Sequence, residues 1–218
     1  MNIKDYRKEF KEDQAVGWLS IEKRLKDIYG KTEPRHYVPP VYAAQGGKDP
    51  IDGTSIYDSK KQVFHHHIIS FGMSELYYNE EAVGQPFSKW GFEFTFRLKP
   101  FTEDKGDPLW VIEVMNNLAR YVYDSGSWFE PYQFVPAGGP IRTETKSKVG
   151  IVGLVFVPDT ELGTIDTPHG ELTFLQMVGI TQKELDRLMA NQDINEVQKL
   201  VDELRKSNPL LITDLTKK

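Results

Sequence analysis

Cysteine is absent from all 218 residues of the sequence. This absence excludes disulfides, thiolate metal ligands and cysteine nucleophiles. No apolar run approaches the ~20 residues that cross a bilayer. The N-terminal stretch MNIKDYRKEFKED is too charged for a signal peptide. We therefore expect a cytoplasmic protein that does not insert into a membrane.

Basic residues are fewer than acidic ones, with 27 Lys and Arg against 32 Asp and Glu, so the net charge is −5. Binding to phosphate backbones requires clustered Lys and Arg, so this balance argues against a nucleic-acid partner. The acidic balance suits a basic protein partner instead. A hydrophobic fraction of 39% predicts a packed globular core, and the length suits one large domain.

The common catalytic motifs are also missing. Neither GxSxG nor GxGxxG occurs. The Gly-Gly-Lys segment at 46–48 does not complete a phosphate loop, because Asp49 stands where Ser or Thr is required. Four carboxylates are candidates for an acid–base pair: Glu75, Glu93, Glu113 and Asp166. Glu93 lies on the polar side of an amphipathic strand, which favours a solvated face over catalysis.

Three consecutive histidines, His65, His66 and His67, suggest a metal site. On a strand, His65 and His67 face one way and His66 the other, so at most two share an ion without further ligands. We expect structural histidines and no metal or cofactor. An enzyme with a His and carboxylate site around these residues and Glu75 remains the alternative.

Helical spacing and end signals predict four helices. An amphipathic helix over 17–30 ends at Gly30, and a central helix over 108–126 begins at a proline and ends at a glycine. Capping patterns predict helices over 182–190 and 194–206. Residues 1–12 form a charged lead-in to a domain over 13–218.

Strand signals outnumber the helices. Prolines and glycines make 31–53 a long connection with a short extended piece. Strands are expected at 54–58, 63–71, 75–79, 90–99, 128–135, 150–157, 171–179 and 210–215. This mixture predicts a single α+β domain with a mixed, largely antiparallel sheet flanked by helices.

The strand over 90–99 has the clearest pattern, because large apolar side chains alternate with small or polar ones. Period-two alternation places all of the large residues on one face. The expected core face carries Trp90, Phe92, Phe94, Phe96 and Leu98. The sequence therefore predicts one buried face, with Glu93 and Arg97 on the other.

The central helix carries Asn116, Asn117 and Arg120 within an otherwise apolar segment. Buried amides and guanidinium groups need partners, because an unpaired polar group costs about 1–3 kcal/mol. Two interpretations remain open: these residues tie the helix to loops and strand ends, or they shape a recognition surface.

Aromatic residues gather at and after the end of the central helix: Tyr121, Tyr123, Trp128, Phe129, Tyr132 and Phe134. Tyrosine and tryptophan pack in cores, and they also anchor protein interfaces because they bury large areas at small entropic cost. Composition alone leaves both interpretations open.

Five phrases occur in a distinctive order: IDGTSIY (51–57), GMSELY (72–77), WGFEFTFRL (90–98), NNLARYV (116–122) and TPHGELTFLQMVGIT (167–181). Together they resemble the N-terminal domain of the Suppressor of fused family, over roughly residues 17–214. The resemblance implies a non-enzymatic, protein-binding domain.

In eukaryotic members of that family, the region after the NLARYV phrase clasps an extended peptide of Gli-type transcription factors. The resemblance thus implies a protein-binding site, and its candidate residues are Tyr121, Trp128, Phe129, Tyr132 and Gln133. Tyr121 matches the family's tyrosine at that site, whereas Gln133 and Phe134 replace an Asp-His pair.

Eukaryotic members continue into a C-terminal domain after the LLITDL-like segment, whereas this sequence stops at Lys218. The chain resembles the stand-alone bacterial branch, which is proposed to supply immunity proteins of polymorphic toxin systems. We therefore expect a partner that is a toxin domain or an extended peptide. A scaffold that binds peptides by strand addition remains a further alternative.

Overall fold

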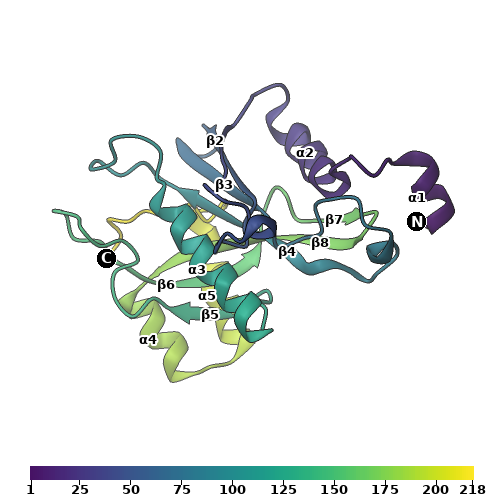
Figure 1. The fold of residues 1–218 in the computed structure, drawn as a ribbon. Helices are drawn as coiled ribbons and strands as arrows, with labels where there is room; N and C mark the ends of the chain where they lie inside the picture. Colours follow the sequence, from purple (N-terminus) through teal and green to yellow (C-terminus); the bar gives the residue numbers. More distant parts are fainter.

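The computed structural model describes residues 1–218 and is built around an open mixed sheet of eight strands (Figure 1). The strands are β1 Arg35–Tyr37, β2 Gly53–Ser59, β3 His65–Phe71, β4 Phe87–Leu98, β5 Phe134–Pro136, β6 Ile151–Pro158, β7 Thr164–Thr167 and β8 Gly170–Thr181. The helices are α1 Ile3–Glu9, α2 Val16–Tyr29, α3 Trp110–Ser125, α4 Gln182–Ala190 and α5 Ile194–Ser207, with short 3-10 turns at Ala43–Gln45 and Glu80–Ala82.

The strand order is β1-β2-β3-β4-β8-β6-β5, and β7 pairs with β8 outside this path. Every pair of strands is antiparallel except β4 with β8, which run parallel at the centre of the sheet. The expected α+β fold with a mixed, largely antiparallel sheet is confirmed.

Helix α3 covers one face of the sheet and lies across its near side in Figure 1. The apolar residues of β4 from Phe92 to Leu98 are buried there against Met115 and Ala119 of α3. Trp90 is partly buried at the border of the same core. The predicted core face of β4 is therefore confirmed.

Two separate groups of helices cover the opposite face. Helix α2 packs Ile21 and Leu25 against β3 and β8. Helices α4 and α5 pack against alternate residues of β6 and β8 near the other end of these strands. Strand β6 contributes to the cores on both faces, as its nearly all-apolar sequence predicts.

The prediction of a solvated polar face on β4 is wrong. Glu93, Thr95 and Arg97 are each 0% exposed. They lie on the face that α2, α4 and α5 cover, where polar partners from β3 and the turn after β6 surround them. The alternation within one strand does not reveal which distant segments pack over its polar side.

No strand forms at 75–79, contrary to the sequence expectation. The backbone there bonds to the start of α2: Leu76 O accepts from the N–H groups of Gly17 and Trp18 at 2.9 and 3.2 Å. A Cβ atom on Gly17 would lie 1.8 Å from Glu75 O, so only glycine permits this approach. The segment docks a helix and does not join the sheet.

Four further segments differ from the sequence expectations. The strand expected over 128–135 begins only at Phe134, and the one expected over 210–215 is reduced to a single bridge between Leu98 and Thr213. Strand β7 was not predicted. Residues 3–9 form α1, whose Tyr6 is fully buried and hydrogen-bonded to His169 Nε2 at 2.7 Å.

We expect Phe94→Ala to lower the free energy of unfolding by about 3–5 kcal/mol, because the ring is buried between β4 and α3 and its removal leaves a cavity. Phe87→Ala is the matched control, since Phe87 is 57% exposed on the same strand. Denaturant unfolding measures both variants. Equal stabilities would show that the core face of β4 is misassigned.

Candidate protein-interaction surface

Helix α3 ends at Gly126, which adopts a left-handed conformation with φ 71°. The chain then turns back along the sheet, and Phe129 anchors this loop. Its ring is 7% exposed, stacks on Phe156 of β6 at a centroid distance of 4.5 Å and lies 5.8 Å from the Tyr121 ring. The loop is thus fixed to the core by one aromatic side chain.

Two aromatic side chains next to this anchor remain open to solvent. Tyr121 is 52% exposed and Trp128 is 53% exposed. Large exposed aromatic side chains on a rigid scaffold are characteristic of protein interfaces.

The parallel pairing of β4 and β8 is interrupted beside this loop. Phe87 pairs with Glu171 and Phe92 pairs with Thr173, so residues 88–91 of β4 face Leu172 alone. Lys89 and Gly91 have positive φ angles of 56° and 79° within this bulge. The bulge bends β4 away from regular pairing.

A cavity of about 460 Å³ lies between the bulge and the loop after α3. Its aromatic walls come from β4 and from the loop, and charged groups stand at its rim. The lining residues are Phe87, Lys89, Trp90, Gly91, Phe92, Trp128, Phe129, Glu130, Pro131, Glu171, Thr173 and Leu175.

The wall formed by β4 is held in place from α3 and from the segment after β3. Gly72 O accepts hydrogen bonds from Tyr123 OH at 2.9 Å and from Lys89 Nζ at 3.2 Å. Trp90 packs edge-on against the Tyr123 ring at 5.5 Å, and the Lys89 ammonium lies 5.1 Å above that ring. These contacts make the cavity a preformed feature of the fold.

Of the five candidate residues from the sequence, the structure brings three together: Trp128 and Phe129 line the cavity, and Tyr121 packs beside them. Tyr132 packs against the core under α4 and α5 instead. Gln133 is exposed, and its Oε1 accepts from Glu130 N at 3.1 Å, which closes the turn.

Sequence reasoning missed the β4 and β8 contributions, namely Phe87, Lys89, Glu171 and Thr173. Gly91 was the available signal, because an isolated glycine within a strand pattern indicates a bulge.

Arg120 supports the interpretation that the polar residues of α3 tie the helix to a loop. Its guanidinium pairs with Asp49 in the connection before β2 and with Glu113 Oε1 at 2.9 Å. Its Nη2 also donates to Asn117 Oδ1 at 2.5 Å. Asn116 is different, since its buried amide oxygen has no hydrogen-bond donor.

The three histidines of β3 divide between the two faces as predicted. His65 and His67 are fully buried on the α2 side. His66 lies on the other side, where its Nδ1 is 2.7 Å from Asp58 Oδ1. No group of three or more His, Cys, Asp or Glu side chains is placed to hold a metal ion.

His65 is held as the neutral tautomer. Its Nδ1 lies 2.8 Å from Val63 O, which only accepts, and its Nε2 lies 3.1 Å from Arg97 Nη1, which only donates. A proton on Nε2 would face the guanidinium. Burial, reinforced by the charge of Arg97, lowers the pKa of His65 to about 4.

His67 completes a buried polar network around Asp159. Its Nε2 lies 3.1 Å from Asp159 Oδ2, and its Nδ1 accepts from Tyr29 OH at 2.6 Å. Burial and Arg97 lower the pKa of His67. Burial alone would raise the pKa of Asp159, but His67 and Arg97 more than offset this and hold it well below its usual range.

Glu93 is the second buried ionisable side chain on β4. It accepts from Ser70 Oγ at 2.5 Å, from Gly72 N at 2.9 Å, and from Ser74 N and Oγ at 3.0 and 2.6 Å. Burial raises the pKa of Glu93 despite these donors. Glu93 fixes the segment that supports the β4 wall of the cavity.

The structure is an α+β domain with a hollow aromatic surface beside β4 and β8. Residues 47–218 match the family model for Suppressor of fused protein (SUFU). The chain is 36% identical over 181 residues to the human Suppressor of fused homologue, and the match covers 78% of this chain and 36% of the human protein. The mouse homologue gives the same values. The chain belongs to the Suppressor of fused family.

Solved structures share this fold. A chain of the Sufu–Fu complex matches with a TM-score of 0.81 and 25% identity, over 94% of this chain and 92% of that chain. Drosophila Suppressor of Fused gives 0.80 at 24% identity, over 95% and 52%. A SUFU homologue from Neisseria gonorrhoeae FA 1090 gives 0.58 at 13% identity, over 90% and 93%. The chain spans about a third of the length of the curated relatives.

Acidic pH should destabilise the protein through His65. Its pKa is lower in the folded than in the unfolded state, so its contribution is fully present above the unfolded pKa of about 6.5 and is lost as pH falls toward the folded value of about 4. From pH 7 to pH 5, wild type should lose about 1–2 kcal/mol of unfolding free energy relative to His65→Gln.

Denaturant unfolding at both pH values measures this difference. His66→Gln is the matched control for the loss of a histidine from β3, because His66 lies on the opposite face, away from Arg97. A difference between wild type and His65→Gln that does not change with pH would contradict the buried neutral assignment.

Proposed function

We propose that this protein acts without catalysis, by binding a protein partner at the surface formed by Tyr121, Trp128, Phe129 and the β4–β8 bulge. The observation that carries this proposal is the cavity of about 460 Å³ between exposed aromatic side chains. A preformed hollow surface with rigid aromatic anchors accepts a partner at low ordering cost.

The partner's inserted segment is an extended peptide or a loop of a toxin domain. The bulge at residues 88–91 supports this shape, because β4 and β8 depart there from regular pairing and both strands line the cavity beside it. By contrast, the outer edges of the sheet are β1 and β5, which have three residues each. Such short edges offer little backbone for strand addition.

Neutralisation of a toxin in the cytoplasm is the specific role that we propose. The net charge of −5 suits a basic target, since complementary charge accelerates association. The Sufu–Fu complex supports protein binding as a use of this fold, because its structure is that of a Suppressor of fused chain with a protein partner.

The test starts with capture of a partner on the immobilised protein, followed by measurement of Kd with purified components. We expect Tyr121→Ala and Trp128→Ala each to weaken binding by about thirtyfold, which corresponds to about 2 kcal/mol for a central interface aromatic residue. Circular dichroism should show unchanged folding, because both side chains are more than half exposed.

Phe64→Ala is the matched control, since Phe64 is 41% exposed before β3, away from the cavity. It should bind with wild-type affinity. If Tyr121→Ala and Trp128→Ala are folded and bind with wild-type affinity, this surface is not the binding site. The acidic faces of the helices between Thr181 and Ser207 would then be the next candidates.

A further inference from the structure

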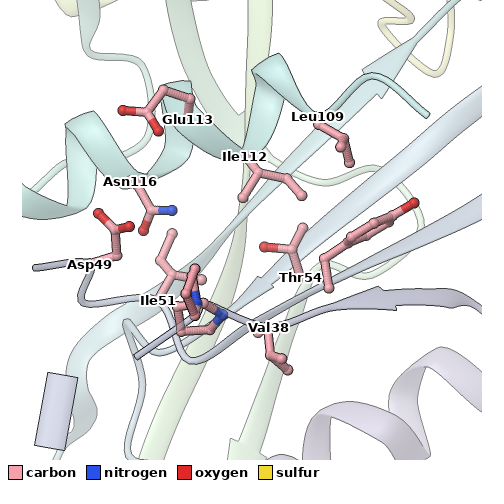
Figure 2. A pocket seen from close by; sticks show the side chains of 12 residues that line it. Val38, Asp49, Ile51, Thr54, Leu109, Ile112, Glu113 and Asn116 are labelled. Atoms are coloured by element: carbon pink, nitrogen blue, oxygen red, sulfur yellow. The ribbon is translucent and has the colours of Figure 1, made fainter. Parts of the chain in front are cut away.

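A second cavity, of about 220 Å³, lies between the first half of α3 and the connection that leads into β2. Figure 2 shows Ile112 and Asn116 pointing from α3 toward the segment that carries Asp49, Ile51 and Thr54. This cavity shares no lining residue with the aromatic surface around Trp128. It is therefore separate from that surface.

The floor of this cavity contains an unpaired acceptor. Asn116 is 6% exposed; its Oδ1 has no hydrogen-bond donor in the protein and is itself closed off from solvent, and Figure 2 shows the amide nitrogen on the side of Ile112. Half a turn of the amide group exchanges the two atoms and brings the acceptor to the cavity. Buried polar atoms are nearly always paired, so an exception that lines a cavity indicates a missing partner. That partner must supply an N–H or O–H group.

The charged groups around the cavity are acidic. Asp49 and Glu113 line it, and no Lys, Arg or His side chain does. Arg120 pairs with both carboxylates from outside the lining. Two carboxylates thus share one guanidinium, which leaves an uncompensated negative charge at the mouth and disfavours anionic ligands.

The remaining walls are mainly apolar, with the hydroxyl-bearing side chains of Tyr37 and Thr54 among them. Ile51 and Ile112 form the inner part, and Val38 and Leu109 are 53% and 49% exposed at the outer part. Pro39 and Pro40 complete this side. The cavity is therefore an apolar slot with acceptors at its polar end.

We propose that this cavity binds a basic side chain, arginine or lysine, presented by a partner protein. Such side chains combine an aliphatic stem with a cationic tip that only donates hydrogen bonds. The stem packs between Ile51, Ile112 and Leu109, while the tip donates to Asn116 Oδ1 and approaches Asp49 and Glu113. A purely apolar side chain would leave Asn116 unpaired.

NMR titration of the ¹⁵N-labelled chain with Nα-acetyl-arginine methylamide tests this proposal, with the lysine analogue as a second probe. We expect saturable shifts of the Asp49, Ile51 and Asn116 amide signals with a Kd of about 1 mM, as suits one small ligand. The uncharged norleucine analogue should bind at least about tenfold more weakly, since it has the stem without the donors.

Two variants locate the site. Asn116→Leu removes the acceptor and Glu113→Gln removes an exposed charge; each should weaken arginine binding by about threefold to tenfold. Glu171→Gln, at the other cavity, is the matched control and should not change it. Glu113→Gln keeps the test valid if Asn116→Leu fails to fold.

Equal binding of the arginine and norleucine analogues would overturn the proposal in favour of an apolar pocket. Absence of saturable shifts at these residues would also overturn it. Neither result bears on partner binding at Tyr121 and Trp128, because that surface is tested with different residues and a different ligand.

Discussion

The ion pair between Arg97 and Asp159 is the contact on which the α2 side of the sheet depends. Both side chains are 0% exposed, and Arg97 Nη2 lies 2.9 Å from Asp159 Oδ1. Asp159 also accepts from Thr95 Oγ1 at 3.2 Å and from Leu162 N at 2.9 Å, and it lies 3.1 Å from His67 Nε2. One carboxylate thus joins β3, β4 and the turn after β6. Because desolvating charges is costly, this arrangement persists only with all of its partners present.

Glu93 connects the buried polar side of β4 to the molecular surface through hydrogen bonds. Its carboxylate holds Gly72 and Ser74, and Gly72 O in turn holds Tyr123 and Lys89 beside the cavity. The aromatic surface is therefore positioned from within, through hydrogen bonds that cross from one face of the sheet to the other. In a binding protein, such preorganisation avoids the entropy cost of ordering a flexible surface when the partner binds.

Local patterns predicted the elements whose signals are local. The alternation around Phe94 identified its core face, and the capping box of Thr181 with Glu184 marked the start of α4. Prediction was wrong at residues 75–79, where a distant segment decides the outcome because α2 docks on them. It was also wrong at the start of β5, which begins only after Tyr132, a residue with a positive φ angle. For the site, the loop aromatic residues were found, but the bulge that brings Phe87 near them involves pairing with β8 more than eighty residues later. No pattern within either strand records that pairing.

A double-mutant cycle on the buried ion pair tests most directly whether this network is the common support of the structure. Denaturant unfolding would compare wild type, Arg97→Met, Asp159→Leu and the double variant. Each single change should lower the free energy of unfolding by about 3–5 kcal/mol, because it removes the fully buried partner of a buried charge; after Asp159→Leu, Arg97 keeps only Glu161, at 2.9 Å, as an acidic partner. The double variant should be more stable than the sum of both losses by about 2–3 kcal/mol. Losses that add to within about 0.5 kcal/mol would contradict the account, because they would show that the two residues act independently.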